Sequence, residues 1–353
     1  MNKRILDYSG KKVFIGIDVH RLTYAVTAIC EGEVVKRWSM AAYPAGLVEA
    51  LLKYFQGAEL ISAYEAGFSG FALHRILVGA GIGNIVIHAA AIEVAAHDKV
   101  KTDKRDSLKI AGLLAVGRLK AIRIPSIEEE RRRLITRTRT QLVGTHSAYM
   151  NRIRMRLHQF GLIDPRSRAR MSLREVERYL AQDLSPELRC VIEVYRDMLV
   201  AIRAKIRALQ AEARKQSKED RLIPVYRSVP GFGEITSREL ANELGDLQQF
   251  SSEKALRRFT GLTPSEFSSG ENRHLGHITR QGSSRIRALL VEAAWFAIRE
   301  DPTLNEAFVR IALRAGKKRA IVAIAAKLIC KVRACFRDGK LYEISEPLMA
   351  SAA

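Results

Sequence analysis

The stretch that decides the fold is Val13–His20, VFIGIDVH, an apolar run that ends on a carboxylate. β-Branched and aromatic residues on both sides of Gly16 are typical of a buried strand with a close-packed neighbour. Asp18 stands where this strand should end. Because ligands of α/β sheets bind at the rim formed by the strand ends, Asp18 is a candidate ligand of a hard cation.

Two further segments also deliver carboxylates. The apolar run 60–64 ends on Glu65, and Asp103 and Asp106 follow in the motif KTDKRDS. If Asp103 caps a helix, Asp106 lies three residues further on at the same helix end, so that both can face one site. Carboxylates from separate elements can converge on one metal ion. The alternative is that each acid is an ordinary turn or cap residue, and the residues alone leave this open.

The composition indicates a polyanionic partner. The 353 residues carry 59 Lys and Arg against 38 Asp and Glu, a formal charge of +21. Such a surplus favours nucleic acid. No stretch has the ~18 consecutive apolar residues of a membrane-spanning helix, and no charged-then-apolar signal segment opens the chain. We therefore expect a cytoplasmic protein, nucleoid-associated when on DNA, with no membrane partner.

The four cysteines show no CxxC spacing and no paired histidines. This pattern supports neither a zinc site nor a disulfide framework. We expect reduced thiols in the protein core at Cys30, Cys190, Cys330 and Cys335.

The first part of the chain, residues 1–124, is expected to be an α/β domain. Periodicity predicts strands at 13–18, 23–30, 33–39, 60–64 and 85–87, and helices at 47–55, 71–77 and 106–116. The resulting order β-β-β-α-β-α-β-α resembles the ribonuclease H-like (RuvC-like) fold, in which a mixed sheet carries acids at adjacent strand ends and on a following helix.

The second part, residues 125–220, is expected to be an arginine-rich helical spacer. Between Arg131 and Arg170 there are eleven arginines and a single acid, Asp164. Guanidinium groups suit bidentate phosphate contact, which favours nucleic-acid binding over a merely solvated face. The candidate contacts are Arg131, Arg132, Arg133, Arg137 and Arg152.

Apolar residues repeat at heptad-like spacing in two stretches of this spacer, which are separated where Asp164-Pro165 breaks the pattern. Two long helices would form an antiparallel hairpin or a dimer coiled coil. At 1.5 Å per residue, the first would span about 54 Å. The predicted seams are Ile135, Leu142, Tyr149, Ile153, Leu157 and Phe160, and Val191, Tyr195, Met198, Ile202, Ile206 and Leu209.

The third part, residues 221–353, is expected to be mainly helical. SVPGFGEITSRELANELGD, residues 228–246, resembles a helix-hairpin-helix element, in which Gly231 and Gly233 would let backbone amides approach a phosphate. An ordinary glycine-rich turn is the alternative. Further helices are predicted near 253–259, 286–299 and 320–336, with a long polar loop before the second of them.

These motifs together carry a resemblance that spans nearly the whole chain. GIDVH, YEAG and KTDKRD precede the arginine-rich spacer, and VPGFGEITS, GLTPSEFSSG and HLGHITRQGSSRIRALLVEAAW follow it. In this order they resemble the insertion-sequence-110 type of transposases, also called the DEDD or Piv/MooV recombinases. The resemblance implies that Asp18, Glu65, Asp103 and Asp106 bind Mg2+ and that Ser269, rather than the adjoining Ser268, is a nucleophile.

The same resemblance implies partners: DNA at the element ends and target, a non-coding guide RNA, and further copies of the chain in a dimer or tetramer. The residues fit cleavage and rejoining of DNA, since a metal ion held by carboxylates neutralises phosphate charge. A serine hydroxyl needs an activator, and its motif holds no adjacent histidine. Phosphate clamps are expected at Arg273, Arg280 and Arg285. The alternatives are a metal-dependent junction nuclease that uses water, and a non-enzymatic architectural DNA-binding protein.

Overall fold

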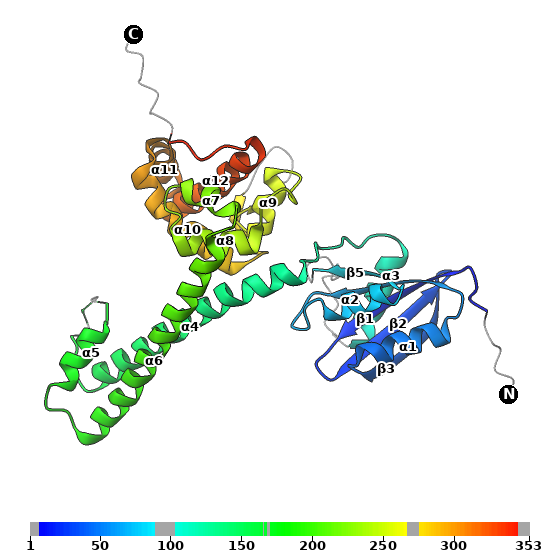
Figure 1. Cartoon of the computed structure of the whole chain (residues 1–353), viewed down its shortest axis with the longest axis horizontal. Helices are drawn as coiled ribbons and strands as arrows, with labels where there is room; N and C mark the ends of the chain where they lie inside the picture. Colours follow the sequence, from blue (N-terminus) through cyan, green and yellow to red (C-terminus); the bar gives the residue numbers. More distant parts are fainter. Residues whose placement is uncertain (1–6, 89–102, 165, 168–169, 267–274, 345–353) are drawn as a thin grey trace, which may run out of the picture. The chain divides into compact units, whose positions relative to one another are not determined.

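The chain separates into two units, Met1–Pro125 and Ser126–Ala353, each of which is described by itself (Figure 1). The structure is a computed structural model. It describes residues 7–88, 103–164, 166–167, 170–266 and 275–344, and of residues 103, 104 and 275 the backbone only. None of the helices in these ranges is long and apolar enough to cross a membrane.

The first unit is built on a five-stranded mixed sheet with the strand order β3-β2-β1-β4-β5. β1 pairs antiparallel with β2 and parallel with β4. The predicted order β-β-β-α-β-α-β-α is confirmed, and the last helix begins three residues before its predicted start. The elements are β1 (Lys12–Val19), β2 (Thr23–Cys30), β3 (Glu33–Ala41), α1 (Pro44–Tyr54), β4 (Glu59–Glu65), α2 (Ala72–Gly79), β5 (Gly83–Ile87) and α3 (Asp103–Ala115).

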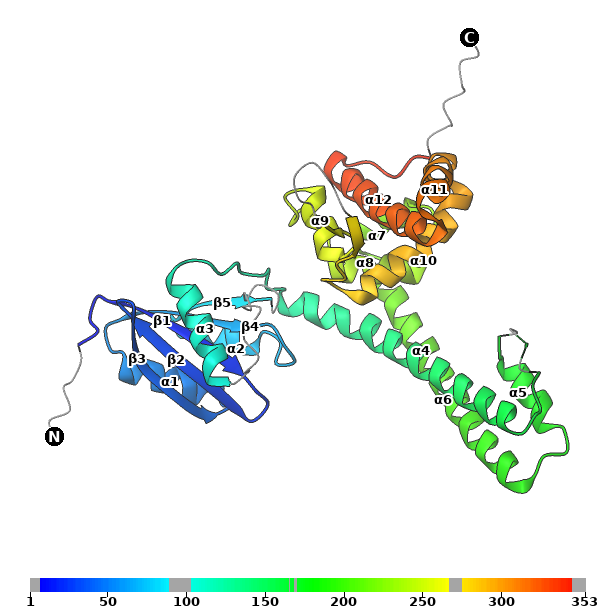
Figure 2. The same cartoon turned by 180° about the vertical axis from the view of Figure 1, so that it is seen from behind.

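Helices cover both faces of this sheet, which explains why its central strands read as continuous apolar runs. On one face, leucines of α1 and α2 pack with Ile15 and Ile17 of β1. On the other face, Ile110 and Leu114 of α3 pack with Ala63 of β4. Figures 1 and 2, which view the chain from opposite sides, show α1 and α3 on opposite faces of the sheet.

Gly16 allows α3 to approach β1 closely. A Cβ atom at this position would lie 2.1 Å from the Ser107 carbonyl oxygen and 2.5 Å from the Ala111 nitrogen. Both atoms belong to backbone and cannot be moved by rotating a side chain. Beside Gly16, a 2.9 Å hydrogen bond between the hydroxyl groups of Thr27 on β2 and Ser107 on α3 holds the helix against the sheet.

We expect Gly16→Ala to destabilise the packing of α3 on β1 by about 1–3 kcal/mol, the usual cost of overpacking a core. Amide hydrogen exchange in α3 measures this directly. Gly112→Ala on α3 is the matched control, because its Cβ would meet nothing within 4 Å. In Gly112→Ala, amide exchange in α3 should be as slow as in the native chain or slower. Equal exchange in Gly16→Ala and Gly112→Ala would contradict the close approach of α3 to β1.

The second unit begins with two long helices, α4 (Ile127–Gln159) and α6 (Pro186–Ser217), with the short α5 (Leu173–Leu180) between them. Figures 1 and 2 both show α4 and α6 side by side, with α5 at one end of the pair. α4 starts with a capping box, in which Ser126 and Glu129 exchange side-chain and backbone hydrogen bonds.

The predicted heptad seam is buried in the last turns of α4, only partly buried before them, and wrong in part for α6. Ile153 and Leu157 are fully buried, but Phe160, 55% exposed, caps the end of α4. On α6, Val191 and Met198 are 39% and 44% exposed, whereas Ile192 and Leu199 are fully buried. The predicted α6 register was therefore one residue off at these two positions, because valine and methionine also supply apolar spacing on the exposed face.

The remaining helices pack around one apolar core, to which residues from Ile223 to Val332 contribute. α8 also contacts both α4 and α6, so the arginine-rich helix and the C-terminal helices share one unit. The elements are α7 (Leu222–Ser228), α8 (Glu234–Leu244), α9 (Glu253–Thr260), β6 (Pro264–Glu266), β7 (Leu275–Ile278), α10 (Ser284–Glu300), α11 (Pro302–Ala315) and α12 (Lys317–Asp338). α5, α7, α11 and the β6–β7 pair were not predicted.

The cysteine prediction holds for Cys30 and Cys330, which are buried free thiols, and Cys335 is partly buried. It is wrong for Cys190, which is exposed on α6. An apolar pattern along an amphipathic helix does not reveal whether a small residue beside the seam faces the core.

Candidate active site and nucleic-acid contacts

The strand register brings two of the predicted acids together. β1 and β4 run parallel, with Gly16 opposite Ala63 and Ile17 opposite Tyr64. Asp18 and Glu65 are the next residues on these strands, so they are neighbours at the carboxyl ends. Side chains alternate between the faces of a strand. Ile17 and Tyr64 are buried on the α1–α2 face, so Asp18 and Glu65 lie on the face covered by α3.

The third acid is carried by the helix over that face. Asp106 precedes Ser107, whose backbone lies against Gly16, two residues before Asp18. Three predicted acids therefore lie on one side of the sheet, near the carboxyl end of β1. Asp103 is the first residue of α3, but its side chain lies outside the described part of the structure.

His20 is a neighbour of this site that sequence reasoning left without a role. Its Nε2 lies 3.1 Å from Oδ2 of Asp18. The His20 backbone N–H also donates a 3.0 Å hydrogen bond to the Thr23 carbonyl, which fixes the turn between β1 and β2. The Asp18 side chain is 20% exposed, so solvent reaches it. The signal in the sequence was the spacing Asp-x-His at a strand end.

The donor set of this site fits a hard cation, since Asp18, Glu65 and Asp106 offer only carboxylate oxygens. Within the ranges whose side chains are described, however, no three His, Cys, Asp or Glu residues are grouped closely enough to hold a metal ion. The described carboxylates share a face and a strand end without forming a closed ligand cage.

The serine motif falls between β6 and β7, in residues 267–274, which lie outside the described part of the structure. Ser268, Ser269 and Arg273 all fall in that gap. The flanks are well defined, because β6 and β7 pair antiparallel and the Ser265 hydroxyl donates a 2.9 Å hydrogen bond to the His277 carbonyl. The turn after β7 packs against the end of α9, where a Cβ on Gly282 would lie 2.1 Å from the Phe259 carbonyl oxygen.

The predicted nucleic-acid arginines fall into two groups. Arg131, Arg132, Arg152 and Arg280 are exposed. Arg152 lies over the Tyr149 ring, and Arg280 has a left-handed φ of 56° just after β7. The other group, Arg133, Arg137 and Arg285, has partners on α8.

Arg137 forms a bidentate ion pair with Glu243, at 2.8 and 2.9 Å. Arg133 donates a 2.8 Å hydrogen bond to the Asn242 carbonyl, and Nε of Arg285 lies 3.9 Å from Glu243. Burial acts to raise the pKa of Glu243, but the hydrogen bond and charge of Arg137 outweigh it and lower the pKa. These arginines hold α4 and α10 to α8, and any phosphate contact by them stays a prediction.

Glu239, one turn before Glu243 on α8, is a buried acid that sequence reasoning missed. Burial raises its pKa, although Thr140 of α4 donates a 3.1 Å hydrogen bond to it. Its partners are about a hundred residues away in sequence, so no local pattern marks it.

The two glycines of the predicted helix-hairpin-helix element differ in surroundings. Gly231 has φ +78°, and a Cβ there would lie 2.3 Å from the Ala293 carbonyl oxygen of α10. Packing against α10 therefore explains Gly231. Gly233 is exposed with open space around its Cα, and it precedes the first turn of α8. Only Gly233 is left accessible to a phosphate.

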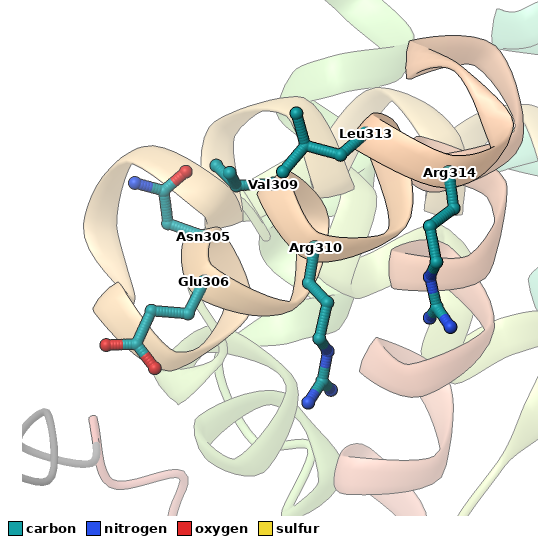
Figure 3. A pocket seen from close by; sticks show the side chains of 6 residues that line it. All are labelled: Asn305, Glu306, Val309, Arg310, Leu313 and Arg314. Atoms are coloured by element: carbon teal, nitrogen blue, oxygen red, sulfur yellow. The ribbon is translucent and has the colours of Figure 1, made fainter.

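A hollow of about 640 Å³ follows the outer face of α11, and its described lining includes none of the residues discussed above. Figure 3 shows its six lining side chains on this one helix, with Arg310 and Arg314 projecting to the same side. Leu313 is 84% exposed. A shallow surface on a single helix offers no catalytic group, so we do not include it in the candidate active site.

Comparison with known proteins places both parts of the candidate site in matched regions. A model of IS110-type DEDD transposases, described as "Transposase", matches residues 15–162, which include the four acids. A model described as "Transposase IS116/IS110/IS902 family" matches residues 225–309, which include Ser269.

Individual relatives that match most of the chain are also named as transposases. "Putative transposase y4qE" of Sinorhizobium fredii is 31% identical, over 83% of this chain and 73% of the relative. "Transposase for insertion sequence element IS1111A" of Coxiella burnetii is 26% identical over 72% of this chain and 71% of the relative. "Transposase for insertion sequence element IS1533" of Leptospira borgpetersenii is 25% identical over 93% and 96%.

Proposed function

Because this chain belongs to the IS110/IS116/IS902 family of transposases, enzymes that act on DNA, we propose that it excises and integrates an insertion sequence through a phosphoserine intermediate. The observation that carries the proposal is the position of Asp18 beside Glu65, with α3 and Asp106 over the same face. Two acids at strand ends and a third on the helix over the same face would weaken the binding of a protein that only binds DNA, since they repel phosphate.

A divalent metal ion is the cofactor that this domain type suggests, and we propose Mg2+ in particular. Asp18, Glu65, Asp103 and Asp106 would hold it, with His20 orienting the Asp18 carboxylate. Such outer hydrogen bonds fix the orientation of metal ligands. When bound, the ion neutralises charge on the scissile phosphate and polarises its oxygens.

Ser269 supplies the nucleophile in this proposal. Its Oγ forms a bond to phosphorus, the bond from phosphorus to a deoxyribose oxygen breaks, and the hydroxyl proton passes to a base while the leaving oxygen takes up a proton. The phosphodiester energy is conserved in the serine ester, so the reverse step rejoins strands without a high-energy cofactor. The transposon's RNA supplies the choice of DNA sequence, and two or four copies of the chain act together.

The alternative function is a metal-dependent junction nuclease, in which the same acids activate water and Ser269 has no chemical role. The experiment that separates the two is incubation of the chain with its element DNA, the element's transcribed RNA and Mg2+. We expect cleaved strands with protein attached, and loss of cleavage on chelation. Cleavage that leaves free DNA ends throughout would favour the nuclease.

The exposed arginines of α4 are proposed to bind backbone phosphates. Replacing both Arg131 and Arg132 by Gln should flatten the dependence of log affinity on log salt by about two units, close to one per lost phosphate contact. Arg137→Gln is the informative comparison, since Arg137 already pairs with Glu243. It should leave the salt dependence nearly unchanged and lower stability by about 2 kcal/mol. Equal salt slopes for all three proteins would assign Arg131 and Arg132 to a solvated face.

A further inference from the structure

A second hollow, of about 440 Å³, lies at the α5 end of the α4–α6 pair. Its lining comes from three segments: one face of α4 around His146 and Asn151, Arg203 on α6, and the residues from Arg170 that lead into α5. Met150, Met171 and Leu173 form its apolar part and belong to the local core. Among the described residues, its lining includes none of Asp18, Glu65 and Asp106.

The charge of this hollow has one sign. Of the ten described residues that line it, three are arginines and none is an acid. Arg170 and Arg203 are the two that matter most, because neither forms an ion pair or hydrogen bond with any residue in the described part of the chain. Burial first, and then the charges of Arg203 and Arg170, lower the pKa of His146, so the field of both arginines reaches into the hollow.

Several other arginines of the same unit are paired with acids. Arg238 lies 2.7 Å from Asp220, Arg214 lies 2.8 Å from Glu234, and Arg137 is bidentate with Glu243. Arg170 and Arg203, both exposed, instead share one concave surface in whose described lining no acid lies. Like charges held together favour an anion that neutralises both.

We propose that this hollow binds a backbone phosphate of nucleic acid, with Arg170 and Arg203 as the charged contacts and Asn151 as a neutral donor. Guanidinium groups match phosphate oxygens bidentately. A phosphodiester within a strand suits a hollow that is open at the surface, and phosphate contacts position a nucleic acid without reading its sequence. DNA and RNA share this chemistry. The proposal requires that the chain handles nucleic acid, but it does not depend on the serine or metal chemistry.

The test uses the full-length chain with two probes of equal length, a duplex DNA and a single-stranded RNA, and compares Arg170→Gln/Arg203→Gln with the control Arg207→Gln/Arg221→Gln. The control removes the same charge from exposed positions outside the hollow. For at least one probe, the hollow variant should flatten the salt slope by about two units relative to the native chain, and by clearly more than the control does. The probe whose salt slope changes shows whether the hollow binds duplex DNA or single-stranded RNA.

An NMR titration of the His146 ring provides a second readout that needs no cleavage activity. Nucleic acid should raise the pKa of His146 in the native chain and the control, because an anion beside the ring favours its charged form. The hollow variant should show no such rise. Equal salt slopes in variant and control, or a His146 response to inorganic phosphate alone but not to either nucleic acid, would overturn the proposal. If the native chain shows the rise in the pKa of His146 with nucleic acid but does not cleave element DNA, the result would count against the proposed function only.

Discussion

Asp18→Asn is expected to stop strand cleavage while nucleic-acid binding stays nearly intact. The substitution keeps the shape of the side chain and its place beside Glu65, but it removes the charge that a metal ion requires. Loss of a residue that only hydrogen-bonds to a metal ligand typically lowers metal affinity or activity by about 10- to 100-fold. Loss of the ligand itself should therefore reduce cleavage by at least about a hundredfold.

Glu65→Gln should have the same effect, and the same strand offers a matched control. Glu59 lies at the opposite end of β4, where it pairs with Lys12 at 3.4 Å. Glu59→Gln should cleave at the native rate. Cleavage rates are measured on element DNA at ordinary and at high Mg2+. Native rates for Asp18→Asn or Glu65→Gln at ordinary Mg2+ would remove the metal-site proposal.

Ser269→Ala is expected to abolish both the covalent protein–DNA product and strand rejoining. The substitution removes the hydroxyl that forms the proposed ester. Ser268→Ala is the control, because it removes the hydroxyl of the residue next to Ser269 in the sequence. It should retain the covalent product. A Ser269→Ala protein that still cleaves, with free DNA ends, would support the water-using nuclease instead.

Mixing the two inactive proteins asks whether copies of the chain cooperate. If acids and serine act from different chains, Ser269→Ala mixed with Asp18→Asn should regain part of the cleavage, since some assemblies then combine both intact residues. If each chain supplies its own acids and serine, the mixture should stay inactive. Gel assays of cleavage across mixing ratios measure this.

The first unit could be predicted from sequence because its signals are local. VFIGIDVH marks a strand by its apolar run and Asp18 by its place at the strand end, and β1 ends at Val19. Local patterns do not show that β1 pairs with β4, which makes Asp18 and Glu65 neighbours; only the resemblance to the ribonuclease H-like fold implied acids at adjacent strand ends. The role of Gly16 also appeared only with α3 lying against it.

The arginine-rich helix shows where sequence reasoning stops. Its arginines look alike in sequence, but Arg132 pairs with Glu128 of the same helix, whereas the partner of Arg137 lies on α8, about a hundred residues later. Arg137 is paired with Glu243, whereas Arg131 is exposed. The heptad register failed on α6 for a related reason, since Val191 and Ile192 are equally apolar and only packing against α4 and α5 distinguishes them.

The central claim is that DNA strands pass through a serine ester, and one measurement tests it most directly. The native chain is incubated with its element DNA, the element's RNA and Mg2+, the protein attached to DNA is isolated under denaturing conditions, and the modified peptide is sequenced by mass spectrometry. The account predicts a nucleotide linked to Ser269. Efficient cleavage with no covalent protein–DNA product, or a product linked to another residue, would contradict it.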